Sequence, residues 1–230
     1  MPGTLAAVRY LIATTVLIVA VVLSRPAAAA PSCASLGGTI EAGQMCHVNI
    51  TAPSYTINMM FPADYPDQQA LTDYLTQTRD GFVNVAQTSG RRDRQPLQME
   101  ATAEQHTSVQ PRTRGVVLKF FQDLGGAHPS SWYKAFNYNL AASRPITFDN
   151  LFAPGIRGLD SIFPLVQGDL ERRNGAQIPP SIGLDPSHYQ NFAITDDQLI
   201  FYFAPGEMLP TAAGPTQVTV PRNALPPLSG

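Results

Sequence analysis

Two segments of the sequence carry side chains that could hydrolyse an ester. In the first, His128 follows the glycines Gly125 and Gly126 and precedes Ser130 and Ser131. A histidine beside a serine can act as the base that activates the hydroxyl, and the backbone N–H groups of a glycine turn can stabilise an oxyanion. The alternative for His128 is an ordinary position in a surface loop.

The second segment is the pair Ser187 and His188. For either histidine, the candidate orienting acid is Asp197, Asp196 or Asp185. A catalytic triad is recognised by geometry, so the order of these residues along the chain does not exclude one. No G-x-S-x-G pattern occurs, which argues against an α/β-hydrolase. The structural alternatives are a helix cap or first-turn residue for Ser187 and a hairpin turn for the two adjacent aspartates.

Other reaction types have little support in the sequence. Nothing brings Glu104, Glu171 and Glu207 together as the paired carboxylates of a glycosidase. The sequence contains no phosphate-binding glycine loop and no metal-ligand spacing. We therefore predict no metal and no cofactor.

A binding function would use aromatic side chains instead. Two aromatic-rich segments, residues 132–138 and 201–203, have the composition of strands. Half of the rings in an alternating strand point to the core, and any that point outward suit recognition of a protein or a glycan. Trp132, Tyr133 and Tyr202 are the predicted binding residues.

The N-terminus has the layout of a secretory signal peptide. Arg9 precedes an apolar run of 14 residues, and small residues up to Ala30 supply the cleavage site, which we expect after Ala29. That run is shorter than the ~20 residues that span a bilayer, so no membrane span is expected after processing. Loss of Arg9 and Arg25 leaves a formal charge of −4, which argues against nucleic acid as a partner.

The two cysteines, Cys33 and Cys46, lie just after this segment. In an oxidising compartment they are expected to form one disulfide, worth ~3 kcal/mol in the chain-entropy model. A metal site with His47 is the alternative, but these residues do not show the spacing of a known site.

The periodicity of the remaining chain predicts an α+β fold. Apolar positions recur at helical spacing after Pro66 and again from residue 159 or 163 to residue 173. Strand patterns cover residues 47–61, 97–109, 115–124, 131–140, 191–203 and 217–220. We predict an antiparallel meander and a C-terminal hairpin packed by two main helices.

Four segments resemble the mycobacterial secreted immunogenic protein family, whose C-terminal half is an RsiV-like domain. They read LKFFQDLGGAHPSSWYKAFNYNL, PITFDNLF, NFAITDDQLIFYFAPGE and AAGPTQVTVP. One departure is Thr211, where RsiV-like domains usually carry a tyrosine, so a ligand role of that tyrosine would not transfer. The resemblance implies an exported protein of the envelope or culture fluid, and some close relatives are regarded as exported carboxylesterases.

The expected division of the chain is a signal peptide (1–29), an N-terminal α+β part with the disulfide loop (30–110), the RsiV-like domain (111–225) and a tail (226–230). The first functional hypothesis is a secreted antigen-family protein that binds a protein or glycan at the envelope or host surface. The alternative is an exported carboxylesterase that hydrolyses short acyl esters.

Overall fold

The computed structural model describes residues 31–88, 95–175 and 177–229 of the chain, and the predicted signal peptide lies outside them. The described residues form an α+β protein with a seven-stranded and a three-stranded sheet. The predicted fold class is confirmed.

The large sheet keeps its strands in chain order. They are β1 (Thr39–Glu41), β2 (Met45–Ala52), β3 (Tyr55–Pro62), β4 (Leu97–Ser108), β5 (Thr113–Asp123), β6 (Ser130–Asn139) and β7 (Arg144–Ile146). Every neighbouring pair is antiparallel except β3 and β4, which are parallel because helix α2 (Gln68–Thr88) connects them. The predicted meander is β4–β6, and the predicted strand over residues 47–61 is a hairpin of β2 and β3.

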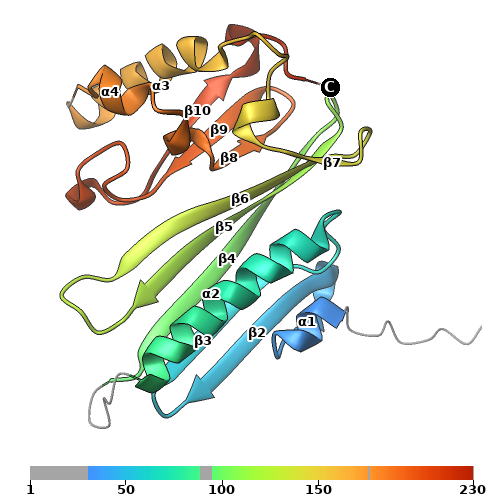
Figure 1. Cartoon of the computed structure of the whole chain (residues 1–230), viewed down its shortest axis with the longest axis vertical. Helices are drawn as coiled ribbons and strands as arrows, with labels where there is room; N and C mark the ends of the chain where they lie inside the picture. Colours follow the sequence, from blue (N-terminus) through green and yellow to red (C-terminus); the bar gives the residue numbers. More distant parts are fainter. Residues whose placement is uncertain (1–30, 89–94, 176, 230) are drawn as a thin grey trace, which may run out of the picture.

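Helix α2 covers one face of the large sheet (Figure 1). Its buried side chains recur at three- and four-residue steps and include Leu71, Leu75, Phe82 and Ala86. Gly81 does not end the helix, which continues to Thr88.

The alternation of β5 places different residues on its two faces. Val116, Leu118 and Phe120 belong to the core beneath α2, whereas Val117 belongs to a small cluster with Ala193 and Tyr202 on the opposite face. Both faces of the centre of the large sheet are therefore covered.

The small sheet covers that opposite face. It consists of β8 (Phe192–Ile194), β9 (Gln198–Phe203) and β10 (Thr216–Pro221) in the antiparallel order β10-β9-β8. The predicted hairpin and the strand after it are both present.

Helix α3 (Gly158–Asn174) packs on the small sheet through Ile162, Val166 and Leu170. It starts before Phe163, so Pro164 lies inside the helix, and it ends at Gly175, whose φ of 68° is left-handed. The exposed position of Pro164 explains why it is tolerated, because a carbonyl that loses its helical N–H partner there can bind water.

The structure therefore has four layers in the order α2, large sheet, small sheet and α3 (Figure 1).

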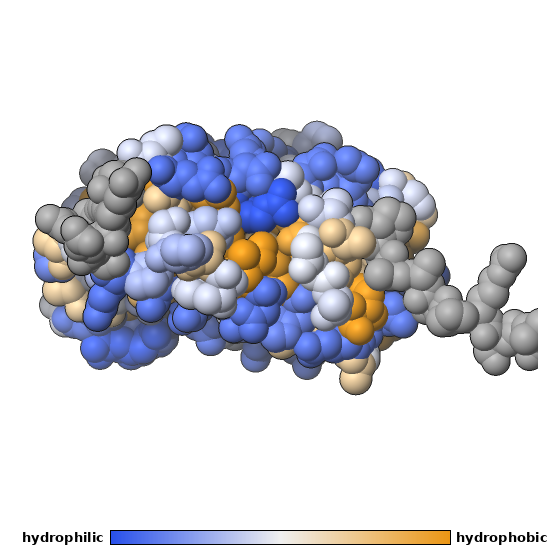
Figure 2. Space-filling view, turned by 90° about the horizontal axis from the view of Figure 1, so that it is seen from below, coloured by the Kyte–Doolittle hydropathy of each residue, from blue (hydrophilic) through white to orange (hydrophobic). Residues whose placement is uncertain are grey.

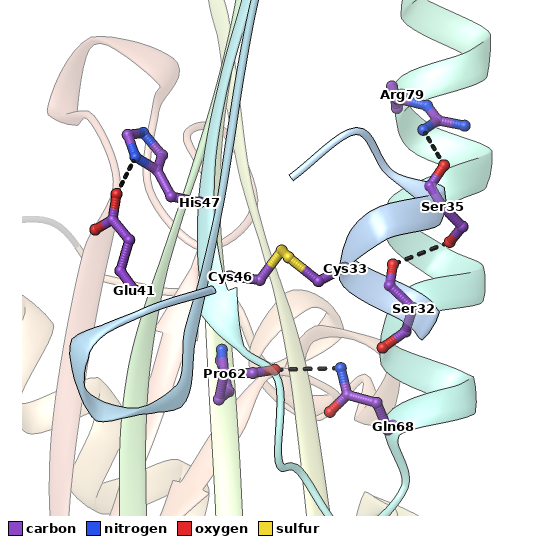
Figure 3. Close-up of a disulfide and its surroundings, with 9 residues drawn as sticks. All are labelled: Ser32, Cys33, Ser35, Glu41, Cys46, His47, Pro62, Gln68 and Arg79. Atoms are coloured by element: carbon purple, nitrogen blue, oxygen red, sulfur yellow. Dashed lines mark hydrogen bonds and ion pairs between the residues drawn. A yellow bond between two sulfur atoms is a disulfide. The ribbon is translucent and has the colours of Figure 1, made fainter. Parts of the chain in front are cut away.

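The disulfide between Cys33 and Cys46 fastens α1 (Pro31–Ser35) to β2 (Figure 3). Gly38 lies against both sulfur atoms, since a Cβ there would come within 2.7 Å of Cys46 Sγ and 2.9 Å of Cys33 Sγ.

His47, the third residue of the alternative metal site, contacts other side chains: its Nδ1 lies 2.8 Å from Glu41 Oε1 and its Nε2 lies 3.2 Å from Asn58 Oδ1. The described residues contain no group of three or more candidate metal ligands.

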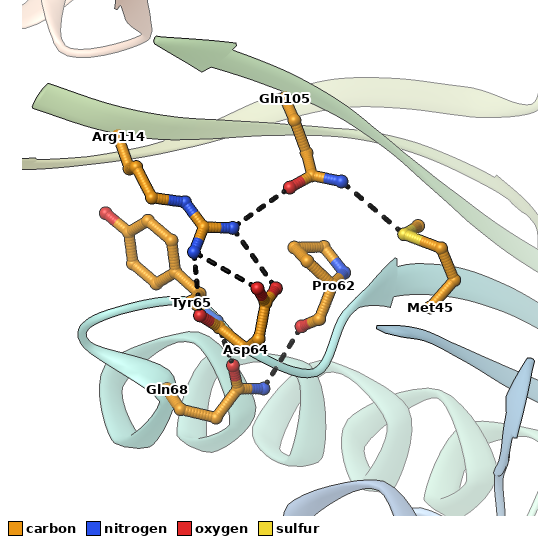
Figure 4. A network of polar contacts seen from close by, with 7 residues as sticks. All are labelled: Met45, Pro62, Asp64, Tyr65, Gln68, Gln105 and Arg114. Atoms are coloured by element: carbon orange, nitrogen blue, oxygen red, sulfur yellow. Dashed lines mark hydrogen bonds and ion pairs between the residues drawn. The ribbon is translucent and has the colours of Figure 1, made fainter. Parts of the chain in front are cut away.

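An ion pair links β5 to the connection that precedes α2 (Figure 4). The Arg114 guanidinium donates to both carboxylate oxygens of Asp64, at 3.1 and 3.2 Å, and to the Asp64 carbonyl oxygen at 2.9 Å. The same guanidinium donates to Gln105 Oε1 on β4. These contacts tie the start of α2 to the sheet that it covers.

The C-terminal segment is anchored, although its prolines gave no core signal in the sequence. Leu225 and Leu228 pack against the core around α3, and Ser229 N–H donates to the Leu151 carbonyl oxygen at 2.9 Å. The expected boundary near residue 110 lies in the turn between β4 and β5, which pair within one sheet. The division of the chain into domains therefore stays a prediction.

None of the described helices is both long enough and apolar enough to cross a bilayer. On the face seen from below, apolar areas are interrupted by polar residues (Figure 2).

Candidate functional site

The turn η3 (Pro186–Tyr189) carries Ser187 and His188 in a fixed position. The Asp185 carboxylate accepts the Ser187 N–H at 2.9 Å and so caps the turn. The buried Tyr189 hydroxyl donates to the Gly183 carbonyl oxygen at 2.8 Å and closes the other end. A proline at the first position and two hydrogen bonds therefore fix the backbone of this segment.

Glu207 is the acid that faces His188. The Nδ1 atom of His188 lies 3.7 Å from Glu207 Oε1, and the two side chains are only 25% and 20% exposed. The other carboxylate oxygen, Oε2, accepts the Ala204 N–H at 2.7 Å, which fixes the direction of the carboxylate. Burial raises the pKa of Glu207, while the Ala204 N–H and His188 act in the opposite direction.

Ser187 is close to His188 in the chain but not bonded to it. Within the described residues, no serine hydroxyl is hydrogen-bonded to a histidine ring, and Ser187 is exposed. Consecutive side chains of a 3₁₀ turn point about 120° apart, which explains the separation. Attack by Ser187 would need a rotated side chain or a bridging water.

His128, Ser130 and Ser131 lie at the start of β6 and in the exposed loop before it. Gly125 N–H, a predicted oxyanion donor, already donates to Asp123 Oδ1 at 2.7 Å. Among the described residues His128 contacts no carboxylate. The catalytic role predicted for this segment stays a prediction, without an acid beside its histidine.

Asp197 lies exposed in the turn between β8 and β9. Its backbone carbonyl accepts the Arg222 N–H at 2.8 Å. The neighbouring Asp196 accepts the Val109 N–H at 2.6 Å, and this bond is the main reason why the pKa of Asp196 is lowered. Neither aspartate has a hydrogen bond or ion pair with a histidine in the described part of the chain. Glu207 is the carboxylate that forms an ion pair with His188, while the charge of Asp185 also acts on that histidine.

The aromatic residues predicted to bind a partner make packing contacts. Trp132 stacks on Phe120 with ring centroids 4.9 Å apart and donates from Nε1 to the Tyr74 hydroxyl at 3.0 Å. Tyr202 is only 1% exposed, and its ring lies 5.2 Å from that of the partly buried Tyr133. These positions favour a structural role, and the predicted binding role is untested.

A second acid–base cluster joins the two sheets and was missed by the sequence analysis. The Tyr202 hydroxyl lies 3.1 Å from both Glu104 Oε2 and His106 Nε2, and those two atoms are 3.7 Å apart. Burial lowers the pKa of His106 and raises that of Tyr202, and it also raises the pKa of Tyr133. Alternation along β4 indicates that residues 104 and 106 share a face, but nothing in the spacing points to Tyr202.

A cavity of about 650 Å³ lies between the start of α3 and the segment that precedes η3. Its apolar lining includes Phe148, Phe152, Ile156, Leu159 and Leu184. Its charged lining consists of Arg144, Asp149, Arg157 and Asp160. A cavity of this size and mixed lining is typical of small-molecule sites.

The C-terminal part of the chain matches a described protein family. Residues 149–223 match the family described as "Protein of unknown function (DUF3298)", which agrees with the predicted RsiV-like domain. A DUF3298 family protein from Pseudomonas aeruginosa PAO1 has a similar fold, with a TM-score of 0.53 and 11% sequence identity, over 83% of this chain and 96% of that one.

Two curated relatives from mycobacteria match nearly the whole chain. The protein named Esterase Rv3036c, from Mycobacterium tuberculosis, is 68% identical over 96% of this chain and 99% of its own length. Immunogenic protein MPB64 of Mycobacterium bovis is 47% identical over 91% of this chain and 95% of its own length. The chain belongs to this mycobacterial immunogenic protein family, as the sequence segments predicted.

Proposed function

We propose that this protein is an exported carboxylesterase that hydrolyses short acyl esters, with His188 as the general base. The name of the 68% identical relative supports the reaction class. The observation that carries the assignment of residues is the contact between His188 Nδ1 and the largely buried Glu207 carboxylate. At 3.7 Å this contact is an ion-pair distance just longer than a hydrogen bond, and no partner of His188 Nε2 occurs among the described residues. A histidine with a carboxylate beside one nitrogen and the other nitrogen available is the base–acid part of a hydrolytic triad.

The proposed reaction proceeds by proton transfer at His188 Nε2. Glu207 stabilises the tautomer that carries hydrogen on Nδ1 and, later, the protonated ring. Nε2 removes a proton from the attacking oxygen, which adds to the ester carbonyl carbon. The same proton then passes to the departing alkoxide as the C–O bond breaks, which releases the alcohol. The acyl group remains on the attacking oxygen and is a carboxylic acid when that oxygen comes from water.

Two sources of the attacking oxygen fit this geometry. In the first, the Ser187 hydroxyl attacks, an acyl-enzyme forms, and water hydrolyses it in a second cycle of proton transfer. In the second, His188 activates water directly. The separation of Ser187 from the ring favours the second route in the resting structure.

Export is part of the proposal. Its support is the N-terminal sequence pattern and the names of the relatives at 47% identity, which are immunogenic proteins. The proposed location is the cell wall or the extracellular fluid.

The test is hydrolysis of p-nitrophenyl butyrate by the purified protein and by His188→Ala, Glu207→Gln and Ser187→Ala variants. We expect His188→Ala to lower kcat/KM by about 10²-fold or more, because general-base catalysis is lost. Glu207→Gln should cause a smaller loss with the protein still folded. Ser187→Ala then separates the two routes, since it abolishes only the acyl-enzyme route.

His128→Ala, Ser130→Ala and Ser131→Ala serve as matched controls in the other predicted segment. A loss confined to these variants would move the site to the loop before β6. A wild-type rate no higher than that of buffer would reject the esterase altogether.

The second candidate function is binding of a protein or glycan at the envelope or host surface. The observation that favours it is the lack, among the described residues, of a serine hydroxyl bonded to a histidine. This function predicts that the protein retains its partner when His188 is replaced, and that no ester is hydrolysed.

A further inference from the structure

We propose that the cavity beside α3 holds the acyl chain of the ester, which would make it the pocket that selects the substrate. This inference rests on the proposed esterase function and names the part of the substrate that the cavity recognises.

The apolar lining of the cavity is partly open to water. Ile156 is 39% exposed and Leu184 is 44% exposed, while the rings of Phe148 and Phe152 form a buried floor. Exposed aliphatic groups above buried rings favour contact with an aliphatic chain, because each methylene that leaves water is stabilising.

The polar lining favours a neutral head group. Arg157 pairs with Asp160 at 3.0 Å, so these two charges offset each other. In the described part of the chain, Arg144 has no ion-pair partner and neither does Asp149, which leaves one cation and one anion at the cavity. The Arg144 guanidinium can donate to an ester carbonyl, and Asp149 offsets its attraction for anions. The charged residues of the lining sum to zero formal charge, which is compatible with a neutral ester.

The cavity also adjoins the proposed base. Leu184 and Pro186 line it, and Pro186 opens the turn that carries His188. The capping bond of Asp185 and the Tyr189 bond to Gly183 fix this segment as a unit. Neither His188 nor Glu207 lines the cavity. The acyl chain would therefore pack against Leu184, with its ester end extending past Pro186 toward the turn that carries His188.

Chain-length dependence tests this arrangement. The purified protein is assayed with p-nitrophenyl acetate, butyrate, hexanoate and octanoate. We expect kcat/KM to rise about fourfold for each methylene until the cavity is filled. In Leu184→Ser and Ile156→Ser, the ratio of hexanoate to acetate kcat/KM should fall by about tenfold relative to the wild-type protein.

Leu165→Ser is the matched control. Leu165 is similarly exposed, at 37%, and lies on α3, but it does not line the cavity. This variant should keep the wild-type chain-length profile. Equal profiles for Leu184→Ser and the wild-type protein would overturn the inference while leaving the esterase standing.

A binding measurement separates this inference from the function on which it rests. The neutral ketone 2-octanone mimics the ester without being hydrolysed, and 2-butanone is its short counterpart. Calorimetric titration should show tighter binding of 2-octanone, and Leu184→Ser should weaken it. Binding that depends on Leu184 without any hydrolysis would reject the esterase and keep the acyl pocket, and equal binding to both proteins would reject the pocket.

Discussion

The two faces of the large sheet are built from different chemistry. Beneath α2, the sheet presents Val116, Leu118 and Phe120, all essentially inaccessible to water, to the apolar face of that helix. On the opposite face, where the small sheet packs, Thr113 and Asn137 are just as deeply buried but polar. The first face has the composition of a stable core, and the second has that of a polar seam.

Several buried polar atoms in the polar seam lack a hydrogen-bond partner. In the described part of the chain, Thr113 Oγ1, Asn137 Oδ1 and Asn139 Nδ2 are buried without a hydrogen-bond partner. Each such group costs about 1–3 kcal/mol. The seam also holds the cluster of Glu104, His106 and Tyr202. The packing of α2 on its sheet therefore supplies stability, whereas the junction between the sheets holds titratable groups at a cost in stability.

Removal of a ring from the α2 face should have the largest effect on stability. Phe120→Ala deletes a fully buried side chain that stacks on Trp132, so we expect a loss of about 3–5 kcal/mol in urea unfolding. Lys119→Ala, an exposed neighbour on the other face of β5, should change stability by less than about 0.5 kcal/mol. Similar losses for the two variants would break the contrast between the faces.

Loss of the disulfide should come next. Replacement of both Cys33 and Cys46 by serine frees α1 from β2, and we expect a loss of about 3 kcal/mol. The matched control is the wild-type protein in a reducing agent, which should unfold at the same urea concentration as the double variant. No effect of either change would mean that α1 adds little to the core beneath α2.

The α2 face was predictable because its signals are local. The helical spacing of Leu71, Leu75 and Phe82 and the alternation along β5 are both visible in a single stretch of sequence. The disulfide was predicted from two cysteines that follow a sequence with the pattern of a secretory signal peptide. Local sequence patterns mispredict two places. Pro164 usually indicates the start or end of a helix, but here it lies inside α3 on its exposed side. The prolines before Leu228 hide the apolar pattern of a segment that packs on the core.

The candidate site was only half predictable for a related reason. Ser187 and His188 are adjacent, and their turn has a recognisable aspartate and proline. Glu207 belongs to the loop after β9, and its approach to His188 depends on how α4 (Pro180–Gly183), η3 and that loop pack on one another. Tyr202 is likewise 98 residues from Glu104, and only the stacking of the two sheets joins them.

Removal of one hydroxyl group should weaken the seam to a lesser extent. Tyr202→Phe keeps the buried ring but deletes the donor to Glu104 and the contact with His106, so we expect a loss of about 1–3 kcal/mol. Tyr133→Phe is the control, since its hydroxyl has no hydrogen-bond partner among the described residues. A loss as large as that of Phe120→Ala would show that the seam is as important for stability as the α2 face.

The smallest expected effect is a dependence of stability on pH that arises in the seam. Burial lowers the pKa of His106 from its ordinary value of 6.5, although Glu104 opposes this shift, and Tyr202 and Tyr133 are the other titratable groups of the cluster. As the pH falls below 6.5, the unfolded chain binds a proton at this histidine more readily than the folded chain does, so stability decreases toward acid. Urea unfolding is measured between about pH 5 and pH 8, where histidines titrate. The free energy of unfolding should decrease less toward acid pH in His106→Gln than in the wild-type protein.

The control is His128→Gln, a change at an exposed loop residue, whose stability should depend on pH as that of the wild-type protein does. If the stability of His106→Gln also depends on pH in that way, the burial of His106 does not couple the seam to pH, and the contrast between the two faces is one of packing alone.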